Sequence, residues 1–314
     1  MTAPFAVVFP GQGSQAVGML DAWGDHPQVR QTLEEASAAL GEDIGALIHA
    51  GPKEQLDLTT NTQPVMLTAG IACWRAFVAE TGLTPVAAAG HSLGEYTALV
   101  AAGALSLADA LPLVRFRAQA MQEAVPVGAG AMYAILGLDG ETVREVCLKA
   151  AAESGEVIEA VNFNDPKQTV IAGSKAGAEK AAELLKAAGA KRALPLPVSA
   201  PFHSSLMKPA AERLKDKLAS VSFQAAAFPV VNNIDVAVTG DADALRDALY
   251  RQAFGPVRWV EVVQALKARG ITRVIEAGPG KVLSGMAKRI DAELASACVF
   301  DPASLAEARA LLEG

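Results

Sequence analysis

The sequence predicts an α/β protein with one large domain built on a parallel sheet, interrupted by a small βαββαβ insertion of the ferredoxin-like pattern. Three observations predict it. Apolar strands alternate with helical patterns toward both ends of the chain, the middle of the chain has a different element order, and glycine- and proline-containing segments bound that middle part.

The first part of the chain alternates short apolar runs with helical patterns. The run 5–9 is a predicted strand, and helical patterns follow at about 27–40 and 63–80. A second buried strand at about 86–89 leads into a helix from Gly94 to about Ala102. Because strands that alternate with helices pair in parallel, we expect a parallel sheet with helices on its faces.

The middle of the chain has the order βαββαβ. Its predicted elements occupy residues 131–138, 140–152, 157–162, 169–173, 176–188 and 192–198. Gly128-Ala-Gly130 opens the segment and Pro195-Leu-Pro197 closes it, as expected of hinges at an insertion. We therefore predict a subdomain of residues 128–197, inserted into a large domain of residues 1–127 and 198–314.

The α/β alternation resumes after this segment. Residues 229–232 and 273–275 are predicted strands. A helix at about 256–269 lies between them, and another at 281–290 follows. These elements complete the predicted large domain.

Composition excludes several classes of function. Of 314 residues, 51% are apolar, and the net charge of -7 argues against a nucleic-acid partner. No apolar stretch reaches the roughly 18 residues of a membrane span. Cys73, Cys147 and Cys298 lie far apart, which predicts buried free thiols and no metal site. The N-terminus has no basic region of a signal peptide, so we expect a cytoplasmic protein without a membrane partner.

The segment Gly90-His-Ser-Leu-Gly94 matches the Gly-x-Ser-x-Gly pattern of a nucleophile elbow. A predicted strand precedes it and a predicted helix follows it, as such an elbow requires. The elbow would place the Ser92 hydroxyl at the positive end of a helix dipole and direct the Leu93 N–H at a developing oxyanion. The alternative is an ordinary glycine-flanked turn with a helix-capping serine.

A serine nucleophile needs a base, and the chain has four histidines. His26 precedes a proline in a polar stretch, and His49 closes a short segment. His91 adjoins Ser92, where the turn would direct its side chain away from Oγ. His203 remains, after the strand that leads back into the large domain. It is either the base or a structural histidine. No acid is selected by spacing, but a backbone carbonyl could also fix the imidazole tautomer.

Arg117 lies in the middle of an apolar stripe on the helix predicted from Leu113 onward. At about 100° per residue, the side chains within roughly 60° of it are apolar: Leu113, Val114, Ala120, Met121 and Ala124. Arg115 lies on the opposite, polar side. A guanidinium among apolar side chains needs an anion. That anion is either an internal Asp or Glu, or the carboxylate of a substrate held bidentately.

A glycine-rich turn, Gly11-Gln-Gly-Ser-Gln15, follows the first strand. It lacks the third glycine of a dinucleotide fingerprint and the Gly-Lys-Ser/Thr of a P-loop. We favour a different role for this turn, in which it supplies a backbone N–H opposite Leu93 to complete an oxyanion hole.

These features together resemble the malonyl-CoA:acyl carrier protein transacylases and the related acyltransferase domains of polyketide synthases. The resemblance extends almost end to end. The segments that carry it are 9–15, 62–64, 90–95, Arg117, 162–164, 198–203, 250–252, 256–258 and 276–280.

The resemblance implies a hydrolase-like core that carries the ferredoxin-like subdomain. It also implies a ping-pong transfer of malonyl from malonyl-CoA to the phosphopantetheine thiol of acyl carrier protein, for fatty acid or polyketide synthesis, with no permanently bound cofactor. A thioesterase of the α/β-hydrolase type is the alternative, but it would need an acid and has no use for Arg117. A binding module that had lost catalysis would be expected to lack Ser92 or His203.

Roles for individual residues also follow from the resemblance. Ser92 and His203 would form a dyad, in which a backbone carbonyl near Gln252 orients the imidazole in place of an acid. The N–H groups of Gln12 and Leu93 would bind the oxyanion.

The other substrate-binding candidates surround this dyad. The resemblance implies that Arg117 grips the malonyl carboxylate and that Phe202, by its bulk, disfavours methylmalonyl. Met121, Asn162 and His91 are expected to support substrate binding.

An acidic carrier protein that docks on an acidic enzyme needs a local basic patch. Lys281, Lys288 and Arg289 lie on or beside one predicted helix and are our candidates. The alternative is a solvated helix face.

Overall fold

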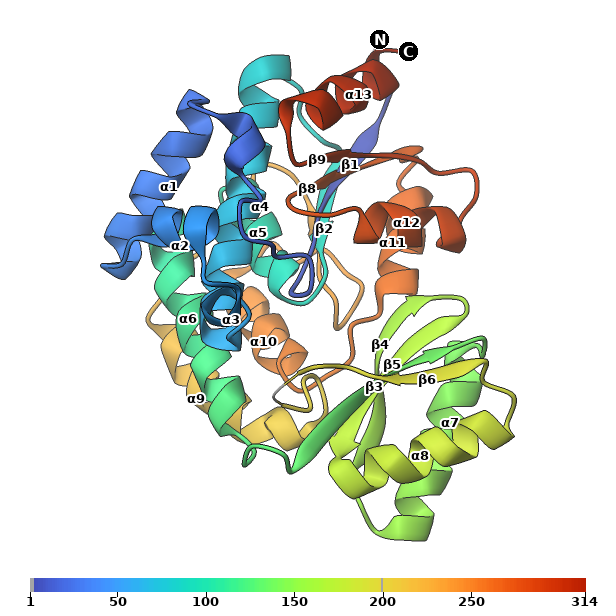
Figure 1. Cartoon of the computed structure of the whole chain (residues 1–314). Coiled ribbons are helices and arrows are strands. Elements are labelled where there is room, and N and C mark those ends of the chain that lie inside the picture. Colours follow the sequence, from blue (N-terminus) through green and yellow to red (C-terminus); the bar gives the residue numbers. More distant parts are fainter. Residues whose placement is uncertain (1–2, 199) are drawn as a thin grey trace.

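Two sheets organise the chain in the computed structural model, which describes residues 3–198 and 200–314 (Figure 1). The larger sheet is parallel throughout, with the strand order β7-β2-β1-β8-β9. Its strands are β1 (Phe5–Phe9), β2 (Ala87–Gly90), β7 (Val230–Val231), β8 (Arg273–Ala277) and β9 (Ala295–Val299). The predicted parallel sheet is confirmed.

Strand β1 lies in the middle of this sheet and is buried on both faces, as in other parallel sheets. Phe5, Val7 and Phe9 point to one side, and Ala6 and Val8 point to the other. The helices on the side of Phe9 are α1 (Pro27–Leu40), α2 (Ile44–Ala50), α3 (Lys53–Leu56), α4 (Thr59–Thr81), α5 (Leu93–Ala101), α6 (Leu107–Glu123), α9 (Lys208–Ala219), α10 (Ala242–Gln252) and α13 (Pro302–Glu313). Helices α11 (Trp259–Ala268) and α12 (Val282–Ile290) cover the side of Val8.

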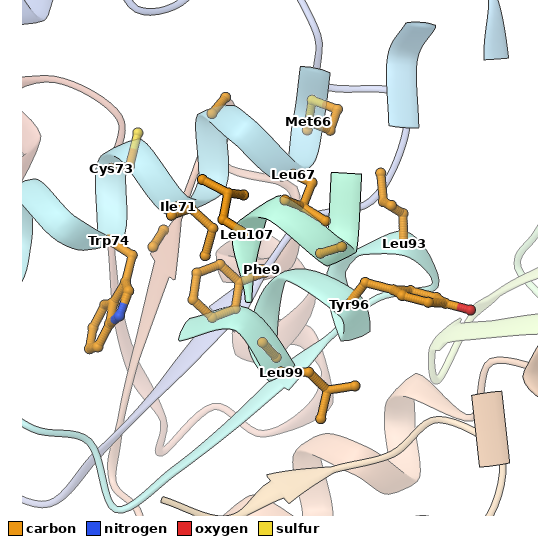
Figure 2. Close-up of a cluster of buried hydrophobic side chains, with 14 of the residues drawn as sticks. Phe9, Met66, Leu67, Ile71, Cys73, Trp74, Leu93, Tyr96, Leu99 and Leu107 are labelled. Atoms are coloured by element: carbon orange, nitrogen blue, oxygen red, sulfur yellow. The ribbon is translucent and has the colours of Figure 1, made fainter. Parts of the chain in front are cut away.

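The core beside β1 packs the helix that follows the elbow against the longest helix of the chain (Figure 2). The rings of Phe9 and of Trp74 in α4 are nearly perpendicular, with 6.3 Å between their centroids. Tyr96 and Leu99 bring α5 into the same cluster. This packing fixes the start of α5, and with it the elbow, relative to the sheet.

The second sheet is antiparallel, with the strand order β4-β5-β3-β6. Its elements are β3 (Gly130–Leu136), α7 (Gly140–Ser154), β4 (Ile158–Asp165), β5 (Gln168–Ser174), α8 (Lys175–Ala187) and β6 (Arg192–Pro195). Helices α7 and α8 pack on one face of this sheet, which forms its own lobe with them (Figure 1). The predicted βαββαβ order is confirmed.

The other face of the antiparallel sheet is packed against the part of the molecule that is built on the parallel sheet, called the large part below. Met132 and Val170 pack there with Met121 of α6 and with Phe202. Strand β4 is also tied to the chain before α11, because Val257 donates to the Val161 carbonyl at 2.8 Å and accepts from the Phe163 N–H at 3.0 Å. The two sheets therefore share a packed boundary.

Several boundaries differ from the prediction. The helix predicted at 63–80 begins at Thr59, and the strand predicted at 192–198 ends at Pro195. Helices α2, α3, α9, α10 and α13 and strand β9 were not predicted. In the family-like segment 198–203, Ser199 lies outside the described residues.

The cysteines agree with the prediction in two of three cases. Cys73 and Cys147 are buried free thiols, but Cys298 is only partly buried, because β9 is an edge strand. No helix within the described ranges is both long and apolar enough to span a membrane.

Candidate active site

The turn after β2 has the geometry that the glycine spacing predicts. Ser92 has φ 53° and ψ -108° and stands at the N-terminus of α5. A Cβ on Gly90 would lie 1.8 Å from the carbonyl of Gly94, and a Cβ on Gly94 would lie 2.1 Å from the Phe9 carbonyl oxygen. Both glycines are required because backbone atoms, which cannot yield, occupy the space of a side chain. The alternative of a helix-capping serine is not observed, since the Ser92 side chain caps no N–H.

Ser92 and His203 lie together, as the sequence suggested. Ser92 Oγ is 2.7 Å from His203 Nε2, and His203 Nδ1 is 2.9 Å from the Gln252 carbonyl oxygen. A carbonyl only accepts, so Nδ1 carries the proton and Nε2 is free to accept one from Ser92. Burial, and then the positive charge of Arg117, lower the pKa of His203 to about 3, which keeps the imidazole neutral.

Arg117 is buried and reaches the same hydroxyl. Its Nη2 donates to Ser92 Oγ at 3.2 Å and to Gln252 Oε1 at 3.0 Å, and its Nη1 donates to Gln63 Oε1 at 2.8 Å. The guanidinium also lies over the Tyr96 ring, 5.4 Å from the centroid. None of these groups is an anion, so the alternative of an internal salt bridge is wrong for the described residues.

Arg115, on the opposite side of α6, has a different environment. Its Nη1 and Nη2 donate to the two carboxylate oxygens of Glu42 at 2.9 and 2.8 Å. One helix thus carries an arginine with a carboxylate partner and, at Arg117, a buried arginine with neutral partners only. A buried guanidinium without a direct anionic partner is costly, and an anion bound beside it would offset that cost.

Three residues that sequence reasoning left without a role hold the site in place. The Glu95 carboxylate accepts from the Gln252 amide at 3.0 Å and from the Asn233 N–H at 2.9 Å. The Asn233 side chain accepts from the Ser92 N–H at 2.8 Å and donates to the Gly90 carbonyl at 2.7 Å. Gln63, the third, binds Arg117 as described. The signals available were the acid in the elbow motif and an asparagine directly after the strand predicted at 229–232.

The two residues whose N–H groups are expected to bind an oxyanion are Leu93 and Gln12. Leu93 is the first residue of α5, so its N–H has no partner within the helix. Gln12 follows β1 in the glycine-rich turn, and its side chain donates to Thr59 at 3.3 Å. Gln12 and Leu93 line the same pocket as Ser92.

The pocket around Ser92 has walls from both sheets. Met121 and Phe202 line it from the large part, and Met132 and Asn162 line it from the antiparallel sheet. The Asn162 side chain is 9% exposed, and its Oδ1 has no hydrogen-bond partner in the part of the chain that is described. Such an atom requires a donor from a ligand or from water.

His91 also borders the pocket, but its ring is engaged elsewhere. Its Nε2 lies 2.8 Å from Asn164 Oδ1, and its ring centroid lies 5.6 Å from that of Trp259. Burial lowers the pKa of His91. The expectation that the turn directs this side chain away from Ser92 Oγ agrees with these contacts.

The three basic candidates for carrier docking do not all have free charges. Arg289 donates to Asp165 Oδ2 at 2.7 Å, and the Lys281 ammonium lies over the Phe300 ring, 5.2 Å from the centroid. Lys288 lines a hollow between α12 and β9 together with Lys281. The helix begins at Val282, so Lys281 immediately precedes it. Within residues 3–198 and 200–314, no His, Cys, Asp and Glu side chains gather as a metal site would need.

Comparison with known proteins shows the family to which the chain belongs. The acyl transferase domain family model matches residues 6–298. The malonyl CoA-acyl carrier protein transacylase of Escherichia coli is 52% identical over 305 residues, which are 97% of this chain and 98% of that protein. The sequence similarity is thus nearly complete in both directions.

Solved structures agree with the sequence relatives. The acyl-carrier-protein S-malonyltransferase of Burkholderia pseudomallei is 66% identical, with a TM-score of 0.96 over 98% of this chain and 100% of that one. A malonyl-transacylase in complex with its holo type II PKS acyl-carrier protein is 49% identical, with a TM-score of 0.95 over 99% of both chains. The chain belongs to the acyl transferase family, among the malonyl CoA-acyl carrier protein transacylases.

Proposed function

We propose that this protein transfers a malonyl group from malonyl-CoA to the phosphopantetheine thiol of acyl carrier protein, through a malonyl ester on Ser92. One observation carries the proposal: Ser92 Oγ lies 2.7 Å from His203 Nε2 and 3.2 Å from Arg117 Nη2 in a single pocket. A nucleophile beside its base suits acyl transfer, and an adjacent cation suits an acyl group with its own carboxylate. The names of the relatives support the same assignment.

In the first half of the reaction, Ser92 Oγ attacks the thioester carbon while its proton passes to His203 Nε2. Nε2 is the nitrogen that can accept it, because Nδ1 keeps its own proton in the bond to the Gln252 carbonyl. The carbon–sulfur bond then breaks, and the proton moves from Nε2 to the sulfur, so that coenzyme A leaves as a thiol. The malonyl group remains as an ester on Ser92.

In the second half, the phosphopantetheine thiol of the carrier protein gives its proton to His203 and attacks the ester carbon. The bond to Ser92 Oγ breaks, and Oγ recovers the proton from Nε2. Malonyl-CoA is a substrate and phosphopantetheine arrives on the carrier, so the chain's own side chains suffice for both steps.

Each half passes through a tetrahedral oxyanion. We assign the N–H groups of Leu93 and Gln12 to this oxygen, because both residues line the pocket beside Ser92. The positive end of α5 adds to the stabilisation at the Leu93 position.

Arg117 would select the acyl group. The malonyl carboxylate supplies the anion that its buried guanidinium lacks, whereas an acetyl group would leave the cation unpaired. We propose that the side chains of Phe202 and Met121 surround the malonyl α-carbon, where Phe202 would disfavour a methyl substituent. Asn162 and His91, which also line the pocket, are assigned to substrate binding.

The thioesterase alternative is not favoured. The relatives carry transacylase names, and the partner of His203 Nδ1 is a backbone carbonyl where a hydrolase triad would have an acid.

We further infer how the fold divides. The parallel sheet and its helices correspond to a hydrolase-like core of residues 1–127 and 198–314, and the βαββαβ unit of residues 128–197 corresponds to a ferredoxin-like subdomain. The elbow at the end of β2 and the antiparallel order β4-β5-β3-β6 support these assignments.

The docking surface for the carrier protein remains assigned to Lys281, Lys288 and Arg289. The ion pair of Arg289 with Asp165 would have to open or be shared for that side chain to take part. We propose the cytoplasm as the location, which the free thiols support, and fatty acid or polyketide synthesis as the pathway that receives the product.

The mass of the intact protein tests the function. After incubation with malonyl-CoA, the protein should gain one malonyl group, and holo acyl carrier protein should remove it with an equal gain in its own mass. Acetyl-CoA and methylmalonyl-CoA serve as comparison donors. Release of the malonyl group mainly to water would instead indicate a thioesterase.

A further inference from the structure

Glu95 is a buried carboxylate beside the elbow that neither half of the proposed reaction uses. Its side chain is 2% exposed. A single oxygen, Oε2, accepts both from the Asn233 N–H at 2.9 Å and from Gln252 Nε2 at 3.0 Å. Glu95 is thus a buried acid with two donors on one oxygen, two residues after Leu93, and its role needs an explanation.

The Gln252 amide has a hydrogen-bond donor on one side and two acceptors on the other. Its Oε1 accepts from Arg117 Nη2 at 3.0 Å, and its Nε2 donates to the Ser92 carbonyl at 3.0 Å as well as to Glu95. A flipped amide would turn its N–H groups toward the guanidinium and its oxygen toward two acceptors. The acceptors on the Nε2 side therefore decide which way this side chain faces Arg117.

We propose that Glu95 is a positioning residue for malonyl selection, whose Oε2 locks the Gln252 amide in the orientation that holds the Arg117 guanidinium beside Ser92. The inference rests on the proposed function and extends it to a residue that touches neither substrate nor the reacting atoms. Malonyl selection then depends on an acceptor oxygen within hydrogen-bond distance of Gln252 Nε2. A rival account would assign it to the negative charge of Glu95 as a counter-ion for Arg117.

Glu95 has a second connection, through Asn233, that must be separated from the first. Asn233 holds the Ser92 N–H and the Gly90 carbonyl, so its loosening would disturb the nucleophile whatever acyl group is transferred. Loss of the Gln252 connection would disturb Arg117 and thus malonyl more than acetyl. The ratio of malonyl to acetyl transfer therefore reports the connection through Gln252. The absolute rate of transfer reports the connection through Asn233.

Two variants of Glu95 distinguish the position of its acceptor oxygen from its negative charge. Glu95→Gln keeps an oxygen where Oε2 lies and removes the charge, and its oxygen is favoured there because both neighbours are donors. Glu95→Asp keeps the charge but is one methylene shorter, so it cannot reach both donors. We expect the malonyl-to-acetyl ratio of kcat/KM to change less than about threefold in Glu95→Gln and to fall about tenfold in Glu95→Asp.

The path through Gln252 is tested by a double-mutant cycle. In a Gln252→Leu background, Glu95→Asp should leave the ratio nearly unchanged, because the amide that it acts through is gone. Glu276→Gln is the matched control: Glu276 is also fully buried, but it accepts from the Ser284 N–H at the start of α12, away from Ser92. This control should leave the ratio as in the wild type.

Three results would overturn the proposal. They are a ratio unchanged in Glu95→Asp, a fall in Glu95→Gln as large as in Glu95→Asp, and the same fall with or without the Gln252 amide. Thermal unfolding of each variant shows that the folded protein is being compared. Failure of the proposed function would be seen separately, as a wild-type protein that takes no malonyl from malonyl-CoA.

Discussion

The parallel sheet and the antiparallel sheet both border the pocket, but they contribute different kinds of residue. The proposed nucleophile Ser92 follows β2 and Gln12 follows β1, both at the carboxyl ends of parallel strands. The antiparallel sheet contributes Met132, Asn162 and Val170, which are apolar or uncharged. Groups that would change covalent bonds therefore come from the large part, and the small part shapes the space around the acyl group.

The two parts also differ in how tightly they fix the positions of individual atoms. At the elbow, four hydrogen bonds with side chains and two obligatory glycines fix a few atoms around Ser92, including its N–H and its hydroxyl. The wall of the antiparallel sheet is held by ordinary apolar packing. We therefore expect changes in the large part to alter the chemistry and changes in the small part to alter binding.

The largest expected effect is that of Ser92→Ala. Without the hydroxyl no malonyl ester can form, and transfer should fall at least about 10⁴-fold while the fold is kept. Intact mass after incubation with malonyl-CoA measures the ester directly. A malonyl adduct that persisted in this variant would place the nucleophile elsewhere.

Two glycines allow a matched test, one at the elbow in the first turn of α5 and one in the antiparallel sheet. A Cβ on Gly94 would lie 2.1 Å from the Phe9 carbonyl oxygen, and a Cβ on Gly173 of β5 would lie 2.0 Å from the Val157 carbonyl oxygen. Alanine at either position should lower the free energy of unfolding by about 1–3 kcal/mol or more, measured by thermal unfolding.

The two variants should differ in activity. At a temperature where both are folded, Gly94→Ala should form the malonyl ester slowly, because the elbow is displaced, and Gly173→Ala should form it at close to the wild-type rate. Equal losses in ester formation would show that the antiparallel sheet is as important for the chemistry as the elbow.

The pH dependence of ester formation tests the state of His203. Because its pKa is lowered to about 3, the imidazole stays neutral well below the ordinary histidine value, and the rate should hold from pH 8 to about pH 5. Burial raises the pKa of Glu95 to about 7, so the profile should be repeated in Glu95→Gln, which has no carboxyl there. A fall centred near pH 6.5 in that variant would contradict a desolvated His203.

The smallest effect is expected at the antiparallel wall. Asn162→Ala removes an amide whose Oδ1 has no partner among the described residues. We expect KM for malonyl-CoA to rise about fivefold with kcat little changed, the cost of one neutral hydrogen bond. Steady-state kinetics measures both values, and a kcat reduced more than tenfold would assign Asn162 to the chemistry.

Much of this site could be predicted from the sequence because its signals are local. The glycines around Ser92 report the turn, and the apolar stripe around Arg117 reports a buried cation. His203 was found because few histidines compete with it. For Ser92 and Arg117, neighbouring residues carry the information, and for His203 the composition does.

The supporting network could not be predicted in the same way. Asn233 binds the Ser92 N–H across 141 positions in the chain, and Gln252 binds the Ser92 carbonyl across 160. No periodicity links such residues, and only the fold brings them together. Strand β9 was missed for a related reason, because small residues give it a weak strand propensity and its pairing with β8 decides its structure.

The central claim is that one pocket joins a serine nucleophile to a cation that expects a carboxylated acyl group. The direct measurement is the ratio of malonyl to acetyl ester formation in the wild type, in Arg117→Ala and in the control Arg115→Ala, whose arginine pairs with Glu42. We expect the ratio to fall about 100-fold in Arg117→Ala and to be unchanged in Arg115→Ala. Equal losses of malonyl and acetyl ester formation in Arg117→Ala would contradict the account.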